Sequence, residues 1–241
     1  MVGLGSNFLH VYSFLQNPTV VLEETKCRVE GHLDRIGYYL SILAKKTDIV
    51  IEGAPRSANS FALRALRTAQ PRKMSAAHHL HVSCQILKAV QWNRPTVLLI
   101  RNPVDVVASW IVRQPSLNAR VCMFYYYHYY NSLKKCLDKV VIAPFDVVTS
   151  DFGRVIKAVN AKYGTNFEVF DHTSDAQSEI FLDRIRAYER RGLSPLGVTV
   201  PLLEKDRLKR EIIPQIKNLP ISQKAMEIYN HIVSRSELLN N

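Results

Sequence analysis

The chain has little of what marks disulfide-rich, zinc-binding or membrane-spanning proteins. It holds four cysteines in 241 residues, and none forms a Cys-x-x-Cys pair. Without such a pair or a close Cys/His set, a structural zinc site is not expected, and the pattern favours reduced, buried cysteines in a reducing compartment. No apolar run reaches the roughly 20 residues that a membrane-spanning helix requires.

Signals of a secretory route are also missing. The first residues show no basic stretch ahead of an apolar one. An Asn-x-Ser/Thr acceptor without proline, the sequence that glycosylation requires, is absent. These two absences lead us to expect a cytoplasmic protein.

What the chain does have is enough apolar material for one core and a surplus of positive charge. Of its residues 47% are hydrophobic and 22% are charged, which predicts a single domain over residues 1–241. The net charge of +11 predicts anionic partners. Because the basic residues are scattered and no nucleic-acid motif occurs, we expect no nucleic-acid partner, although a peripheral contact with an acidic membrane surface fits the charge.

Two segments share an unusual design. Residues 49–53 and 96–100 are short apolar runs typical of buried strands, and each ends in a turn that contains proline and arginine. A helix-like stretch with a hydroxyl residue follows each turn. A strand that ends in this way directs backbone N–H groups and the positive end of a helix to one point, which suits a phosphate group. Two such turns suit a ligand with two separate phosphates.

Strands and helices alternate along the middle of the chain. This order predicts an α/β fold with three layers, in which helices cover both faces of a central parallel sheet. Ligands of such folds bind at the carboxyl ends of the strands, where both turns lie. Residues 1–47 are expected to be a helical segment, 48–170 the nucleotide-binding core and 171–241 a helical C-terminal part. The strands are expected at 49–52, 72–77, 96–100 and 139–143, and the helices at 7–45, 59–68, 82–92, 105–113, 119–138, 151–163, 175–190, 203–217 and 222–239.

The two turns resemble those of the sulfotransferases that use 3'-phosphoadenosine 5'-phosphosulfate (PAPS). Family members carry P-[KR]-S-G-[TS]-[TS] after the first strand, and here Pro55-Arg56-Ser57-Ala58-Asn59-Ser60 stands there. They carry R-[ND]-P-x-[DE]-x-x-x-S after a later strand, and the segment from Arg101 to Ser109 matches every defining position. The first motif departs at Ala58, where glycine is usual, and at Asn59. The match covers about residues 48 to 110, and more loosely the chain to about 170.

The resemblance implies a P-loop type of nucleotide-binding fold, a PAPS donor, a hydroxyl acceptor and no required metal. The acceptor would be a glycan, a glycolipid or a small molecule, and the Arg-for-Lys loop is closer to bacterial or carbohydrate-type members than to cytosolic phenol and steroid enzymes. By the same resemblance Arg56 would contact the phosphosulfate and stabilise the departing oxygen, and Arg101 and Ser109 would bind the 3'-phosphate. The remaining donor contacts would come from Ser57, Ala58, Asn59, Ser60 and Phe61.

Three histidines stand between the two motifs. The family uses a histidine as general base at the end of the strand before the second turn, and the spacing back from Arg101 favours His79, with His78 and His81 as competitors. Family members also have a late basic loop over the 3'-phosphate. Its usual signature is missing here, and Arg207, Lys209 and Arg210 are possible substitutes or a solvated helix face.

Two other function classes stay open. One is a P-loop kinase or nucleotide hydrolase, although the Gly-x-x-x-x-Gly-Lys-[Ser/Thr] loop is absent and Ala58 stands where its second glycine would be. The other is a non-catalytic basic module that binds PAP, the desulfated donor, or another polyanion. The oligomeric state is not indicated by any feature of the sequence.

Overall fold

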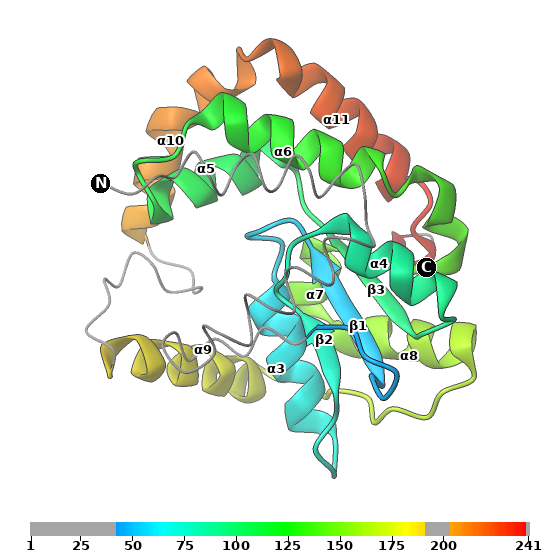
Figure 1. Ribbon diagram of the computed structural model, residues 1–241. Coiled ribbons are helices and arrows are strands. Elements are labelled where there is room, and N and C mark those ends of the chain that lie inside the picture. Colours follow the sequence, from blue (N-terminus) through cyan, green and yellow to red (C-terminus); the bar gives the residue numbers. More distant parts are fainter. Residues whose placement is uncertain (1–41, 191–202, 240–241) are drawn as a thin grey trace, which may run out of the picture.

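A computed structural model describes residues 42–190 and 203–239 of the chain (Figure 1). The helix expected over residues 7–45 falls mostly outside these ranges, and its last four residues, 42–45, are not helical. Cys27 also lies outside the described residues. No helix within the described ranges is both long and apolar enough to cross a membrane.

The described part of the chain forms an α/β fold around a four-stranded sheet in which every pairing is parallel. The strands are β1 (Ile49–Gly53), β2 (Ala76–His78), β3 (Thr96–Ile100) and β4 (Val141–Pro144). Their order across the sheet is β2-β1-β3-β4. The expected fold class, three layers with a central parallel sheet, is therefore confirmed.

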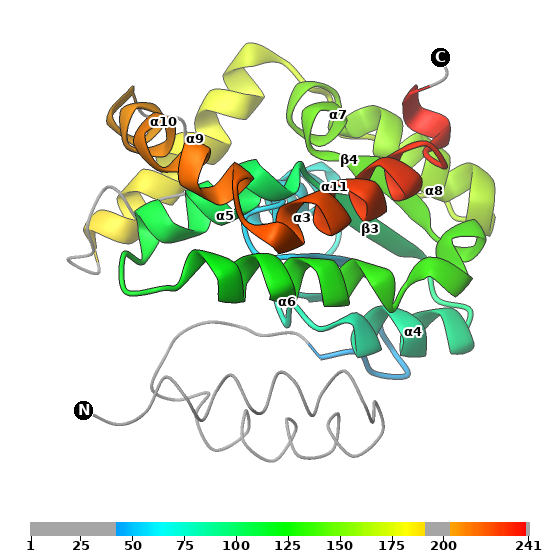
Figure 2. The ribbon, with the colours of Figure 1, turned by 90° about the horizontal axis from the view of Figure 1, so that it is seen from above.

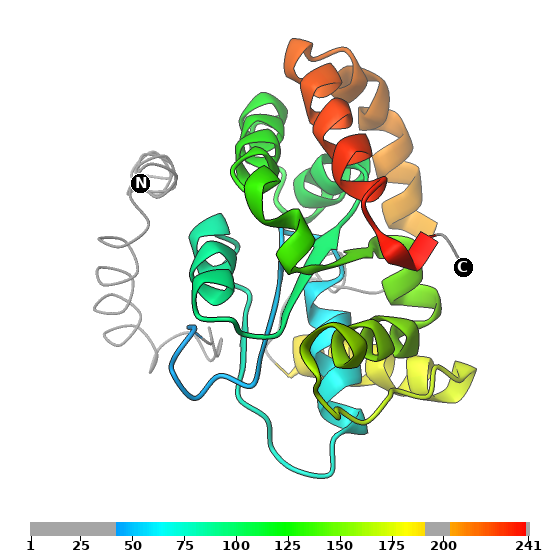
Figure 3. The same ribbon diagram turned by 90° about the vertical axis from the view of Figure 1, so that its right-hand side faces the viewer.

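Alternate residues of the strands face two separate apolar clusters, one on each side of the sheet. Val97 and Leu99 of β3 pack in one cluster with α3 and α8, whereas Leu98 and Ile100 pack in the other with α5, α6 and α11. Figure 3 shows the sheet between these two layers of helices. The helices that cover it are α3 (Asn59–Ala69), α4 (Ser83–Gln91), α5 (Pro103–Arg113), α6 (Ala119–Asn131), α7 (Phe145–Ser150), α8 (Phe152–Tyr163) and α11 (Pro220–Val233).

Two further helices stand at the carboxyl end of the sheet. They are α9 (Ser174–Glu189) and α10 (Leu203–Lys217). Helix α10 packs on α5, and α9 contacts α3. Because α3 and α5 each follow one of the two strand-end turns, α9 and α10 extend the molecule on either side of those turns (Figure 1).

Several expected boundaries were wrong. The helix predicted over 119–138 ends at Asn131 and is followed by a 3-10 helix, η1 (Lys134–Lys139), so β4 begins two residues later than expected. The last helix ends at Val233 rather than at 239, with a short 3-10 helix, η3 (Glu237–Leu239), behind it. The strand expected over 72–77 is shorter, and α7 was not predicted.

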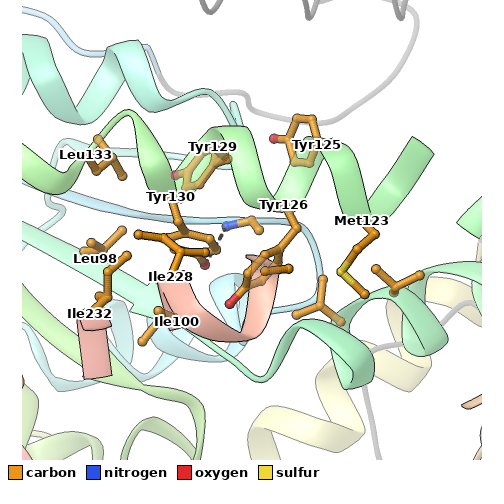
Figure 4. Close-up of a cluster of buried hydrophobic side chains, with 14 of the residues drawn as sticks. Leu98, Ile100, Met123, Tyr125, Tyr126, Tyr129, Tyr130, Leu133, Ile228 and Ile232 are labelled. Carbon is orange, nitrogen blue, oxygen red and sulfur yellow. Dashed lines mark hydrogen bonds between the residues drawn. The ribbon is translucent and has the colours of Figure 1, made fainter. Parts of the chain in front are cut away.

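The aromatic helix α6 packs along α11, which lies beside it (Figure 2). Tyr126, Tyr129 and Tyr130 are almost wholly buried and pack with Ile228 and Ile232 of α11 (Figure 4). The hydroxyl groups of Tyr126 and Tyr130 also bond to the backbone of the strand-end turns.

Candidate active site

The two strand-end turns meet because β1 and β3 are neighbours in the sheet. The strands pair in parallel with Gly53 opposite Leu99, so both end at the same edge. Nε of Arg56 donates to Oγ of Ser109 at 3.0 Å. Nη1 of Arg101 donates to the carbonyl oxygen of Arg56 at 3.2 Å. The defining residues of both motifs thus form one cluster.

The first turn opens the amino end of α3 toward the same point. Arg56 and Ala58 have φ of 71° and 68°, values that disfavour side chains with a Cβ. Ala58 is the capping residue of α3, and because its methyl group offers no acceptor, no side chain caps the helix. The side-chain amide of Asn59 donates to the carbonyl of Ala54. The first N–H groups of α3 therefore remain as donors for a ligand.

The second turn places Arg101 on an aromatic ring. Its guanidinium lies 3.9 Å from the centroid of Phe145, and its Nε is buried without a hydrogen-bond partner among residues 42–190 and 203–239. Burial lowers the pKa of Arg101, although arginine stays charged at neutral pH. A buried donor without a partner at this position fits an anionic ligand.

Tyrosines of α6 hold the backbone of all three loops that follow β1, β2 and β3. The hydroxyl of Tyr130 accepts from the N–H of Ala54 at 3.2 Å and donates to the carbonyl of Leu99 at 2.7 Å. The hydroxyl of Tyr126 donates to the carbonyl of Arg101 at 2.7 Å, and that of Tyr125 donates to the carbonyl of His81. One helix thereby fixes the relative positions of the loops.

A cavity of about 760 Å³ lies over both turns. Its walls come from the first turn, the start of α3, the histidine loop, α5, α7, α9 and α10. They are formed by Pro55, Arg56, Ala58, Asn59, Ser60, Phe61, His79, His81, Arg101, Ser109, Trp110, Arg113, Gln114, Phe145, Thr149, Gln177, Phe181, Arg184, Lys205, Asp206 and Lys209.

The charged lining of the cavity is almost entirely positive. Six basic side chains and one acidic side chain face it: Arg56, Arg101, Arg113, Arg184, Lys205 and Lys209, and Asp206. Lys205 is only 4% exposed, and burial together with nearby Arg56 lowers its pKa to about 8. Placing this much like charge in a partly buried site is unfavourable in itself, so the lining favours a ligand with several negative charges.

Comparison with solved structures shows a distant likeness. The structure is similar to the crystal structure of mouse sulfotransferase SULT7A1 complexed with PAP, with a TM-score of 0.43 and 12% sequence identity over 78% of this chain and 91% of that chain. No family model matches the chain, and no curated protein matches it in sequence. A likeness this distant does not identify a function.

His78 is the last residue of β2, and His79 and His81 follow it beside the first turn. Nε2 of His79 is 2.9 Å from Oγ of Ser60, and Nδ1 of His79 is 2.8 Å from Nδ1 of His78. Nε2 of His78 is 3.4 Å from Nη2 of Arg67, which comes from α3. Arg67, His78, His79 and Ser60 thus form a chain of hydrogen bonds that ends at the cavity.

His81 belongs to a separate set of contacts. Its Nδ1 is 2.8 Å from the carbonyl oxygen of Gly53, and 3.8 Å from Oε2 of the fully buried Glu52. Glu52 also accepts from the N–H groups of Leu80 at 2.7 Å and His81 at 3.2 Å, and from Gln85 at 2.9 Å. These contacts hold His79 and His81 in a loop where both have positive φ, 57° and 56°.

Burial keeps the histidines neutral. It lowers the pKa of His78 and His81 to about 4 and that of His79 to about 2, with further lowering by neighbouring cations. The same burial raises the pKa of Glu52 to about 8, against the opposing effect of its N–H donors. At neutral pH the three rings are therefore uncharged.

The structure brings all the expected site residues together, and all except Ser57 line the cavity. Ser57 is fully buried behind it, and Phe61 is mostly buried in an aromatic cluster with Phe170 and Phe181. Of the three possible late basic residues only Lys209 reaches the cavity, whereas Arg207 pairs with Glu211 at 3.8 Å.

The sequence did not point to Arg113, Phe145, Arg184 or Lys205, because no motif marks them and they come from four different helices. Groups of three or more His, Cys, Asp or Glu side chains that could hold a metal ion do not occur within the described ranges.

Proposed function

We propose that the protein is a sulfotransferase that moves a sulfuryl group from PAPS to a hydroxyl group. The observation that carries this proposal is the meeting of the two strand-end turns through Arg56, Ser109 and Arg101 over one basic cavity. A donor with phosphates on both the 5' and the 3' position needs two such anion sites a short distance apart.

The residues around the turns fit the two ends of this donor. Arg56 and the uncapped start of α3, with Ser57, Ala58, Asn59 and Ser60, would bind the 5'-phosphosulfate. A second set would bind the 3'-phosphate and the base. In this set Arg101 and Ser109 take the phosphate, and Phe61 contributes an edge to the adenine pocket.

The proposed chemistry is an in-line displacement at sulfur. The acceptor oxygen forms a bond to sulfur while the bond from sulfur to the bridging oxygen breaks, and the electron pair stays on the 5'-phosphate of PAP. Arg56 stabilises that charge, and the proton of the acceptor hydroxyl passes to a histidine of the loop after β2. The family resemblance assigns this last role to His79, and the reaction requires no metal.

The acceptor is proposed only by class: a hydroxyl of a glycan, a glycolipid or a small molecule. A cavity of about 760 Å³ has room for a nucleotide and part of an acceptor. The cytoplasmic location, a peripheral membrane contact and the lack of a nucleic-acid partner remain predictions from the sequence.

Calorimetric binding of PAP tests the donor site without knowledge of the acceptor. We expect PAP to bind the wild type far more tightly than ATP, and Arg101→Ala to weaken PAP binding by at least tenfold. Arg120→Ala, an exposed change on α6 outside the cavity, is the matched control and should bind PAP as the wild type does.

Three outcomes would reject the proposal. If PAP does not bind, the sulfotransferase function is wrong. If ATP binds more tightly than PAP and is hydrolysed with Mg²⁺, a nucleotide kinase or hydrolase replaces it. PAP binding without transfer to any acceptor would instead indicate a binding module.

A further inference from the structure

The chain of hydrogen bonds through His78 and His79 has only one direction. A guanidinium donates and cannot accept, so Nε2 of His78 must accept from Arg67. Neutral His78 then carries its proton on Nδ1 and donates it to Nδ1 of His79. Neutral His79 consequently carries its own proton on Nε2, the atom 2.9 Å from Oγ of Ser60. His79 therefore presents a hydrogen-bond donor, and no lone pair, at Ser60.

His81 has the opposite arrangement. The carbonyl of Gly53 can only accept, so Nδ1 of His81 carries the proton. The lone pair of the neutral ring is then on Nε2. The side chain of His81 is 25% exposed and lines the cavity, and its Nε2 has no hydrogen-bond partner in the described part of the chain. This nitrogen is ready to accept a proton from a ligand in the cavity.

The surroundings of His81 also suit a base. The carboxyl group of Glu52 lies 3.8 Å from Nδ1, next to the ring that would receive the proton. The backbone of His81 is fixed on both sides, by Glu52 at its N–H and by Tyr125 at its carbonyl. A histidine oriented through Nδ1 with Nε2 toward the ligand is the arrangement that general bases use in other enzyme folds.

We propose that His81, and not His79, is the general base of the sulfuryl transfer, and that His79 acts as a hydrogen-bond donor beside it. This inference rests on the proposed function. The acceptor O–H bond breaks and its proton goes to Nε2 of His81, as the acceptor oxygen bonds to sulfur and the bond to the 5'-phosphate oxygen breaks. The imidazolium returns its proton to solvent after PAP has formed. His79 donates through Nε2 to an oxygen of the ligand in place of Ser60.

Two substitutions separate the roles, because each keeps one nitrogen position and removes the other. His81→Asn keeps an N–H near the carbonyl of Gly53 but has no group at Nε2. His79→Gln keeps an N–H at the position of Nε2 but cannot take a proton. Transfer is measured as PAP release from PAPS, with methyl glycosides, a galactosyl lipid in detergent and 2-naphthol as acceptor probes.

We expect His81→Asn to lower kcat by about 100-fold or more with unchanged PAP binding, and His79→Gln to stay within about tenfold of the wild type. The reverse pattern would make His79 the base, and losses of similar size in both variants would also overturn the division of roles.

Nitrogen NMR of the wild type with ¹⁵N-labelled histidine tests the same inference without an acceptor. We expect a protonated Nδ1 in His81 and a protonated Nε2 in His79, with each signal assigned from the corresponding variant. The opposite tautomer in either ring would overturn the inference. If PAP does not bind the wild type, the proposed function itself fails, whatever the tautomers are.

Discussion

Single side chains around the cavity are held in charge states that burial decides. His78 is 4% exposed and has a pKa of about 4, while Lys205, equally buried, has a pKa of about 8. Both groups therefore lose part of their tendency to carry a charge. This loss makes the stability of the protein sensitive to pH in a direction that can be worked out.

Acid should destabilise the protein through His78. The unfolded chain takes up a proton near pH 6.5 that the native state refuses until about pH 4, so stability falls as the pH falls through this window. The limiting slope is about 1.4 kcal/mol per pH unit. In urea unfolding between pH 7 and pH 4, the free energy of unfolding should fall less for His78→Gln than for the wild type. Glu52 and the other histidines titrate in both proteins, so the difference between the two profiles reports on His78. Parallel pH profiles would contradict this account.

At the level of single residues, the sequence alone predicted the least about the site. The spacing of the Arg101 motif placed Ser109 correctly near the arginines, because a helix fixes where its seventh residue points. The direction of the histidine hydrogen bonds depends on Arg67, which comes from another element and carries no motif. Such a contact depends on tertiary packing, and a single sequence does not reveal it.

At the level of whole elements, the site depends on how closely β1 approaches β3. A Cβ on Gly53 would stand 2.4 Å from the carbonyl oxygen and 2.8 Å from Cβ of Leu99. Neither of these groups can move without shifting the strand. The glycine therefore allows the two turns to come together.

Gly53→Ala should for this reason cost much more stability than Gly164→Ala. The second glycine has no atom within 4 Å of the added Cβ and suffers only from its φ of +65°, a cost of about 1 kcal/mol. We expect Gly53→Ala to lower the free energy of unfolding by about 3 kcal/mol or more, because the added methyl group overpacks the sheet and displaces a strand. Equal free energies of unfolding for the two variants would show that the approach of the strands is not critical.

The tyrosines of α6 connect helix packing to the site. Tyr130→Phe would leave the N–H of Ala54 and one acceptor position of Leu99 without their partner in a buried region, a cost of about 1–3 kcal/mol. Tyr127→Phe, on the same helix and only half-buried, is the control and should change stability by less than about 0.5 kcal/mol. Unfolding in urea measures both, and PAP binding should weaken only in Tyr130→Phe.

The positions of the two central strands were predictable from the sequence. The expected strand 96–100 is found at those residues, and the first strand is one residue longer than expected, because continuous apolar runs bounded by Gly and Pro leave few alternatives. The end of α6 was not predictable, since apolar and polar residues continue past Asn131 without a strong stop signal. Helix α7 is short and follows Pro144 directly, so its pattern was hidden in the strand that precedes it.

The molecule as a whole concentrates its net charge of +11 unevenly, with six basic side chains and one acidic side chain at the cavity. Lys205 and Arg207 stand two residues apart on α10, but only Lys205 lines the cavity. Lys205→Gln should weaken PAP binding by about tenfold and lower its dependence on salt, whereas Arg207→Gln should do neither. Calorimetry at two salt concentrations measures PAP binding by both variants. Equal effects of the two substitutions would mean that Lys205 attracts the ligand only by long-range charge and not by contact.

The central claim is that the two turns form one site for two phosphates, and a binding cycle with PAP and 5'-AMP tests it most directly. The two ligands differ only by the 3'-phosphate. We expect the wild type to prefer PAP by about 100-fold, and we expect Arg101→Ala to lose most of this preference while its affinity for 5'-AMP changes little. If Arg101→Ala weakens both ligands equally, or if the wild type does not distinguish them, the second turn does not read the 3'-phosphate and the account is wrong.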